Sequence, residues 1–231
     1  MNLHNVLKEY LKENEPADLL FEELTNCGDV YLIGGVLREY KDHQSFENLR
    51  DIDIVVDVKN ETLWNDTFIK FGARRNRFGG RKVLFGSLPI DTWDVKQTWA
   101  YREGIVICNP DEYISRLSET VFLNIDGIIY DWKRGIWYEE EYRKAMESKI
   151  LDVVLESNPQ IPLNIVRAFI LQKRYDMSFS EKLKKIIIRE SHKYDSFSEF
   201  TQMLEEVELR RYGKLFFSKE ELLRKIRQLV C

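Results

Sequence analysis

The sequence predicts an α+β protein in which a mixed-sheet domain over residues 1–150 is followed by a small helical domain over residues 151–231. In the first part, short runs rich in β-branched and aromatic residues alternate with segments of helical periodicity, as in YLIGGVLREY and DIDIVVD. From Glu139 onward the pattern is helical throughout, and Asn158 and Pro159 interrupt it near the change. We therefore expect the domain boundary near residue 150.

Each expected element follows from the spacing of its apolar residues and from the turn residues that bound it. Helices are expected over residues 1–14, 17–26, 35–41, 61–71, 139–155, 162–175, 180–191, 196–209 and 218–230. Strands are expected over residues 30–33 and 51–58, twice between 81 and 96, and in a hairpin across 119–138 with WKRG as its turn.

The composition bounds the class of protein. A chain of 231 residues with 44% apolar content can hold a catalytic domain and a helical appendage. The net charge of −4 argues against binding long duplexes over the whole surface, so any nucleic-acid contact would come from a local patch. Cys27, Cys108 and Cys231 lack metal-ligand spacing and are odd in number, which is typical of reduced thiols.

The N-terminal segment alternates apolar and charged residues at helical spacing, which is unlike a signal peptide. No apolar run reaches the roughly 20 residues that span a bilayer. We therefore expect a cytoplasmic protein with no membrane partner.

The clearest chemical signal is a pair of carboxylates that follows a glycine turn. An apolar strand runs into Gly34 and Gly35 and then a helix, and a second strand carries Asp51 and Asp53. Side chains alternate along a strand, so the two carboxylates share one face while apolar residues bury the other. Close carboxylates repel each other unless a cation lies between them, and Mg²⁺ combines one or two carboxylates with phosphate oxygens. The pattern predicts a metal site for a nucleoside triphosphate.

Two nearby residues have alternative interpretations. Unpaired amides at the helix N-terminus attract phosphate, and Arg38, one turn into that helix, would reach the same phosphates. The alternative is a surface pair of Arg38 with Glu39 or Asp42. Asp57 shares the face of Asp53 but lies about 13 Å farther along at 3.3 Å per residue, so we interpret it as a strand-end acid.

A third carboxylate is expected on the strand in KVLFGSLPIDTWDVKQTW. Such a group beside a carboxylate pair completes a two-metal phosphoryl-transfer site. Asp91 and Asp94 both qualify by position, but alternation places them on opposite faces, so only one can point at the site. We predict Asp91.

These residues resemble the DNA polymerase β-like nucleotidyltransferase superfamily, and within it the head domain of CCA-adding tRNA nucleotidyltransferases and bacterial poly(A) polymerases. The family's Gly-Gly-x-x-Arg turn resembles Gly34, Gly35 and Arg38, and its Asp-x-Asp pair resembles Asp51 and Asp53. The resemblance covers about residues 28 to 180 and implies a nucleotidyltransferase head domain at the N-terminal side.

The family's nucleotide-contacting Arg-Arg-Asp-x-x-x-Asn segment resembles ISRLSETVFLNIDGIIYD, in which Arg116 and Asn124 hold recognisable places. The resemblance implies that both contact the nucleoside. Thr120, Phe122 and Asn124 also alternate as on a strand, and the alternative for Asn124 is a buried amide that caps a turn.

The helix in IPLNIVRAFILQKRYDMSF resembles the family's first helix after the head, which carries Glu-Asp-x-x-Arg. Here those positions fall on Gln160, Ile161 and Asn164, so the side chains that select the base in the family are missing. Arg167 is a candidate for the nucleotide cleft, and the alternative is a basic outer stripe on an amphipathic helix.

The resemblance implies an enzyme that moves a nucleoside monophosphate from a nucleoside triphosphate to an acceptor hydroxyl. Two Mg²⁺ ions, with Mn²⁺ as a substitute, would be bound by Asp51 and Asp53, and Asp91 would bind the ion that activates the acceptor. The acceptor implied is an RNA 3′ end of the tRNA type. Because only about 80 residues follow the head, the alternative acceptor is a small molecule or a protein. A third hypothesis is a nucleotide-binding module without catalytic activity. The oligomeric state stays open.

A basic run lies between two turn signals in GARRNRFGGRKV. It is either a solvated loop or a flexible loop that meets the phosphates of the nucleotide or the acceptor. Its cations are Arg74, Arg75, Arg77, Arg81 and Lys82.

Overall fold

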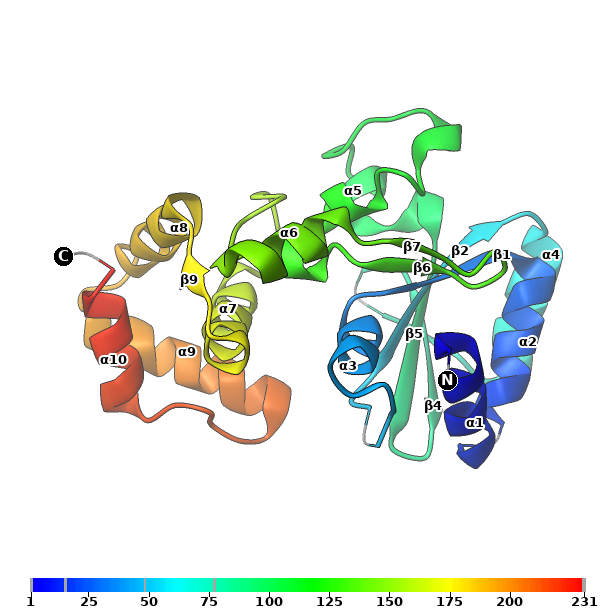
Figure 1. The fold of residues 1–231 in the computed structure, drawn as a ribbon, viewed down its shortest axis with the longest axis horizontal. Coiled ribbons are helices and arrows are strands. Elements are labelled where there is room, and N and C mark those ends of the chain that lie inside the picture. The colour runs from blue at the N-terminus through cyan, green and yellow to red at the C-terminus, as the bar shows by residue number, and fades with distance from the viewer. Residues whose placement is uncertain (1, 15, 48, 77, 230–231) are drawn as a thin grey trace. The chain divides into compact units, whose positions relative to one another are not determined.

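The computed structural model describes residues 2–14, 16–47, 49–76 and 78–229. The contacts divide the chain into two units, one of residues 1–120 and 126–141 and the other of residues 121–125 and 142–231 (Figure 1). The predicted α+β class is confirmed. The expected domain division near residue 150 stays a prediction.

The first unit is built on a mixed sheet with the strand order β3-β4-β5-β2-β1-β6-β7. Only the β2–β5 pair is parallel among these neighbours. The strands are β1 (Gly28–Ile33), β2 (Ile52–Val58), β3 (Arg74–Arg75), β4 (Arg81–Phe85), β5 (Leu88–Asp94), β6 (Ile129–Asp131) and β7 (Ile136–Tyr138). The helices are α1 (Leu3–Glu13), α2 (Ala17–Cys27), α3 (Gly35–His43), α4 (Glu61–Lys70) and α5 (Trp99–Arg102).

One face of this sheet forms the core. The register aligns Ile54, Leu32, Tyr130 and Trp137 in one row across four strands, and the first three of these are buried. Helix α3 covers this face, because its Tyr40 stacks on Trp137 with ring centroids 6.1 Å apart. The carboxylates of β2 point to the opposite face, since side chains alternate along the strand.

Helices α1 and α2 pack on the same core face. Their residues His4 and Phe21 both contact Trp132, at centroid distances of 3.9 Å and 4.6 Å. Trp132 follows β6, and its amide donates to the carbonyl of Val30.

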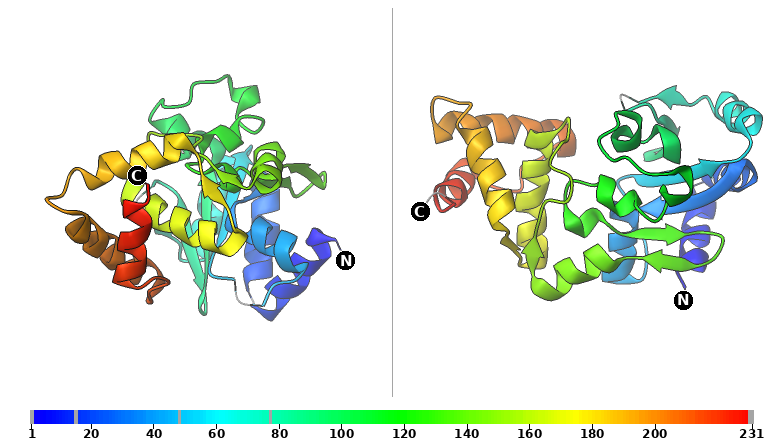
Figure 2. Two further views of the ribbon diagram at one scale, coloured as in Figure 1. Left: turned by 60° about the vertical axis from the view of Figure 1, so that its left-hand side comes forward. Right: turned by 90° about the horizontal axis from the view of Figure 1, so that it is seen from above.

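The second unit is helical, apart from a two-stranded parallel sheet (Figures 1 and 2). Three of its helices begin at serines whose hydroxyls accept an amide of the first turn, namely Ser180, Ser196 and Ser218. The elements are β8 (Ile150–Leu151), α7 (Ile161–Tyr175), β9 (Ser178–Phe179), α8 (Glu181–Ser191), α9 (Phe197–Tyr212) and α10 (Lys219–Arg227), and α6 (Glu140–Ser148) spans the boundary.

Two expected elements are wrong. The helix expected over 139–155 ends at Ser148, because Lys149 takes a positive φ of 56° and the next two residues pair with β9. The hairpin expected across 119–138 is confined to β6 and β7, with WKRG as its turn. Residues 117–120 and 124–126 instead form short 3-10 turns.

No helix within the described part of the chain is both long and apolar enough to cross a membrane.

Candidate active site

Two of the predicted catalytic carboxylates lie side by side. The parallel register of β2 and β5 places Asp53 opposite Asp91, and β4 continues the row with Lys82 opposite Asp91. Residues paired in this way point to the same face, and adjacent strands are about 4.8 Å apart. Asp51 comes directly before β2, two positions ahead of Asp53, so alternation places it on this face as well.

The second acid of β5 lies on the core face. Asp94 is opposite Val56, which is fully buried. Its Oδ1 accepts the amide of Lys96 at 3.2 Å. Burial raises the pKa of Asp94 above its ordinary value, although the Lys96 amide opposes this shift. The structure therefore places Asp91, and not Asp94, beside Asp53, while the catalytic role of Asp91 stays a prediction.

The carboxylates have cationic and polar partners within the chain. Asp51 accepts two hydrogen bonds of 3.1 Å from the guanidinium of Arg50. Asp91 accepts Asn76 Nδ2 at Oδ1, over 3.0 Å, and its Oδ2 forms an ion pair with Lys82. The charges of both acids are therefore partly neutralised by the chain's own side chains.

The glycine turn connects β1 to α3. Gly34 has a φ of 66° and a ψ of −119°, a conformation that favours glycine. Its amide donates to the carbonyl of Ile128 over 3.1 Å, and a Cβ at this position would meet no atom within 4 Å. A Cβ at Gly35 would lie 3.9 Å from Arg38 Nη2. The turn thus leaves open space next to a guanidinium, which suits an anionic group.

Arg38 forms an ion pair with Asp126. Both side chains are largely buried, at 11% and 8% exposure. The alternative surface pair with Glu39 or Asp42 is not what the structure shows, because the guanidinium points inward. The spacing of motifs gave no signal for Asp126, which lies 88 residues away in sequence. Phosphate binding by Arg38 stays a prediction.

Two side chains hold the basic loop, those of Asn76 and of Arg102, whose Nη1 donates to the Phe78 carbonyl at 3.0 Å. Asn76 Oδ1 accepts the amides of Phe78 at 3.0 Å and Gly80 at 2.9 Å, while its Nδ2 donates to Asp91. At Gly80, a Cβ would lie 2.7 Å from the carbonyl oxygen of Thr92, so this part of the loop lies directly on β5. Asn76 was not predicted from the sequence, where its position between Arg75 and Arg77 is the one feature that marks it.

The cations of this run have different environments. Arg74 lies opposite Lys82 on the edge strand β3 and is exposed, as is Arg75. Burial lowers the pKa of Arg81, and the charge of Arg75 adds to this shift. Arg77 lies outside the described residues.

Arg116 is tied to its own segment. Its guanidinium donates to both carboxylate oxygens of Glu119, at 2.9 Å and 2.7 Å, and to the carbonyl of Ile107 at 2.8 Å. These hydrogen bonds to Glu119 raise the pKa of Arg116. Nucleoside contact by Arg116 would require this pairing to open.

Asn124 belongs to the second unit, and in place of the strand expected over residues 120–124 the structure has a single β-bridge between Leu123 and Val153. The side chain is nearly buried and donates to the carbonyl of Ile150 over 3.0 Å. Its Oδ1 accepts the amides of Ile125 and Asp152, each over 3.0 Å. This geometry matches the turn-capping alternative, because the amide bridges two backbone segments.

Arg167 also lies in the second unit, on α7. Its Nη1 donates to Asn164 Oδ1 over 3.3 Å, and Asn164 Nδ2 donates to Asn158 Oδ1 over 2.8 Å. Asn164 is buried, at 5% exposure. Of the nine predicted site residues, the first unit therefore holds Asp51, Asp53, Asp91, Gly34, Gly35, Arg38 and Arg116, and the second holds Asn124 and Arg167.

The donor set of Asp51, Asp53 and Asp91 fits Mg²⁺ or Mn²⁺, because hard cations prefer carboxylate oxygens. Among the described residues, their ligand atoms do not all lie within 4.8 Å of one another. Asp51 is paired with Arg50, and Asp91 with Lys82. A divalent ion at this face would therefore compete with internal cations.

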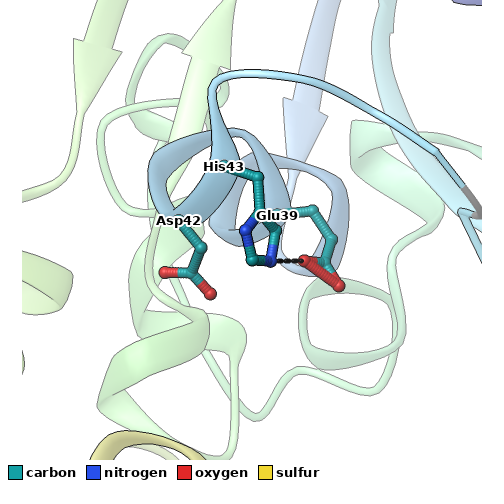
Figure 3. A group of neighbouring side chains, drawn as sticks. All are labelled: Glu39, Asp42 and His43. Atoms are coloured by element: carbon teal, nitrogen blue, oxygen red, sulfur yellow. Dashed lines mark ion pairs between the residues drawn. The ribbon is translucent and has the colours of Figure 1, made fainter.

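A second acidic group lies on α3 (Figure 3). In the described ranges of the chain, the one group of potential ligand atoms all within 4.8 Å of one another comes from Glu39, Asp42 and His43. His43 Nε2 lies 3.4 Å from a Glu39 carboxylate oxygen, one helical turn away. This is the geometry of an ordinary surface ion pair at i and i+4.

Several solved structures share this fold. A CCA-adding enzyme in complex with ATP matches with a TM-score of 0.62 and 17% identity, over 96% of this chain and 50% of that chain. A Thermotoga maritima CCA-adding enzyme complexed with tRNA matches with a TM-score of 0.57 and 17% identity, over 87% and 47%. A tRNA nucleotidyltransferase with a primer tRNA and an incoming ATP analogue matches with a TM-score of 0.55 and 18% identity, over 87% and 57%.

No protein-family model matches the sequence. No curated protein matches it either. The chain spans about half the length of the chains in the solved structures. The fold expected from the resemblance is therefore confirmed, and at this level of identity the likeness extends to the fold alone.

The close contact of Gly80 with β5 predicts a large loss of stability on adding a methyl group. In Gly80→Ala, the Cβ would lie 2.4 Å from Trp93 Nε1 and 2.7 Å from the Thr92 carbonyl oxygen. We expect the free energy of unfolding, measured by urea titration, to fall by at least about 2 kcal/mol. Gly86→Asn is the control, because Gly86 has a positive φ in open space and the substitution should cost under about 1 kcal/mol. Equal losses would contradict the packing of the loop on β5.

Proposed function

We propose that the protein is a magnesium-dependent nucleotidyltransferase that moves a nucleoside monophosphate from a nucleoside triphosphate to an acceptor hydroxyl. The observation that carries this proposal is the pairing of Asp53 with Asp91 on one face of the sheet, with Asp51 two positions before Asp53. The glycine turn and Arg38 at the start of α3 support it, because they join an anion-binding helix end to the same sheet. The shared fold with nucleotidyltransferases adds independent support.

In this proposal Asp51 and Asp53 would hold both metal ions, and Asp91 would hold one of them. When bound, the metal ions lower the pKa of the acceptor hydroxyl and offset the charge on the triphosphate. Gly34, Gly35 and Arg38 bind the triphosphate. The acceptor oxygen forms a bond to the α-phosphorus, its proton passes to Asp91 or to solvent, and the bond to pyrophosphate breaks.

We further propose that the acceptor is an RNA 3′ end. Lys and Arg outnumber Asp and Glu in residues 142–231, whereas the reverse holds in residues 1–141. A basic helical unit joined to an acidic catalytic unit favours a polyanionic acceptor on the helical side. The neighbours solved with tRNA support the same class of acceptor.

The test is transfer of label from each α-labelled nucleoside triphosphate, with Mg²⁺, to a mixture of total RNA and cell extract. Label that migrates with RNA and depends on Mg²⁺ is the expected result. Label on small molecules or on protein would show that the acceptor belongs to that class and is not RNA. No transfer to any fraction, with the nucleotide still bound, would indicate a non-catalytic module.

The carboxylate pair should be essential for turnover but not for folding. Asp53→Asn keeps the shape of the side chain and removes its charge, so we expect transfer to fall by at least about 100-fold. The free energy of unfolding without metal should change by less than about 1 kcal/mol. Label transfer and urea titration on the same preparation measure both effects. Substantial turnover in the Asp51→Asn, Asp53→Asn double variant would contradict the two-metal site.

The two acids of β5 should differ in effect, because they lie on opposite faces of the sheet. Asp91→Asn should lower transfer as strongly as Asp53→Asn. Asp94→Asn should keep transfer within about threefold of the wild-type rate, since Asp94 only caps a turn on the core face. A larger loss in Asp94→Asn than in Asp91→Asn would reverse the assignment of the third carboxylate.

The polar groups at the start of α7 predict that an ordered C-C-A end is not built. Ile161 cannot form hydrogen bonds through its side chain, and the Asn164 amide is already engaged with Asn158 and Arg167. A site that lacks paired polar groups loses strong selection between bases. Incubation of tRNA lacking its 3′ end with all four triphosphates, followed by sequencing, should give single-nucleotide or mixed additions. Efficient addition in the order C-C-A would show that base selection does not need the missing motif.

A further inference from the structure

Asp91, the predicted third metal ligand, already has a cationic partner within the chain, the ammonium of Lys82. Asp53, Asp91 and Lys82 occupy three neighbouring strands in one transverse row, so two carboxylates and an ammonium share one face. The Asp91 side chain is 11% exposed, and that of Lys82 is 37% exposed. The ion pair between them is therefore shielded from solvent on the Asp91 side, while the lysine can reach water.

The two oxygens of Asp91 have separate partners. Oδ1 accepts the Asn76 amide at 3.0 Å, and Asn76 is itself fixed by the amides of Phe78 and Gly80. Oδ2 is held by Lys82. Because the amide is neutral and anchored whereas the ammonium is charged and carried on a flexible stem, Oδ2 is the oxygen that can change partner.

A divalent ion and the ammonium compete for Oδ2. Two cations drawn to one carboxylate oxygen repel each other strongly at contact distance. A metal ion that binds Asp91 must therefore displace Lys82 from Oδ2 or bind less tightly beside it. The lysine stem can move, because more than a third of its side chain is exposed and the strand that carries it lies next to the edge strand β3.

We propose that Lys82 is an exchangeable counter-ion of Asp91, which a divalent cation displaces on binding, so that this lysine sets the metal affinity of the third carboxylate. The inference rests on the proposed function, since that function gives Asp91 its metal. Lys82 is in this view a positioning residue: it holds the Asp91 carboxylate in place before the metal arrives. Binding of the metal and release of the ammonium are then one event.

The first test measures the affinity of the full chain for Mn²⁺ by electron paramagnetic resonance, in the absence of nucleotide. Lys82→Met should bind Mn²⁺ about five- to tenfold more tightly than the wild type, because the competing cation is gone. Lys59→Met is the matched control, since it removes a lysine paired with Asp57 on β2. Asp57 lies about 13 Å along the strand from Asp53, so screening should keep this change within about twofold.

The double variant separates direct exchange from a general change in charge. In an Asp91→Asn background, Lys82→Met should change the Mn²⁺ affinity by less than about twofold, because the shared oxygen has lost its charge. An equally large gain in Mn²⁺ affinity in that background would show that the lysine charge acts through the electrostatic field around Asp51 and Asp53. That result would overturn the proposed exchange at Asp91. Lys82→Gln, checked by circular dichroism, serves as the second variant if Lys82→Met does not fold.

The second test observes the ammonium directly. Acetylation of lysine amines, measured by peptide mass spectrometry, should become several-fold faster at Lys82 on addition of Mg²⁺, while the rate at Lys59 stays constant. An unchanged rate at Lys82, or equal Mn²⁺ affinities in Lys82→Met and Lys59→Met, would overturn the proposal. Both readouts are independent of turnover. Exchange without nucleotide transfer would reject the proposed function alone, and transfer without exchange would reject this inference alone.

Discussion

The parallel pairing of β2 with β5 is the constraint on which the candidate site depends. It brings Asp53 next to Asp91 from positions 38 residues apart, and places two negative charges about one strand spacing from each other. Parallel strands need a crossover connection, and here α4, β3 and β4 supply it. The same crossover delivers Lys82 to the other side of Asp91, so the path of the chain creates both the charge repulsion and its internal compensation.

Compensation of buried or crowded charge is repeated around the site. Arg50 holds Asp51, Lys82 and Asn76 hold Asp91, and Asp126 holds Arg38. Each pair offsets part of the cost of placing these charges in or near the protein interior. The pairs differ in burial, and this difference suggests which can exchange. The Arg38 pair is buried on both sides and suits a fixed support, whereas the lysine of the Asp91 pair reaches solvent.

Local pattern accounts for the parts of the structure that were predicted correctly. Alternation on β2 and β5 gave the faces of Asp53, Asp91 and Asp94, because a period of two does not depend on distant residues. The glycine pair gave the turn between β1 and α3. The partners of these residues could not be predicted in the same way. Asn76 and Asp126 act across 15 and 88 residues, and neither belongs to a periodic pattern.

The errors have the same physical origin. Residues 120–124 alternate as in a strand, but extended pairing is limited to a single bridge between Leu123 and Val153, and the Asn124 amide binds the backbone of residues 150 and 152 where a 3-10 turn begins. The helix expected through residue 155 ends for a related reason, since Ile150 and Leu151 pair with β9. The polar groups that the resemblance links to the base, Asn124, Asn164 and Arg116, all have internal partners. The side chains linked to phosphate and metal have internal partners too. What distinguishes them is access: the Lys82 side chain of the Asp91 pair reaches solvent and the turn at Gly34 borders open space, so an ion from solution can reach both places.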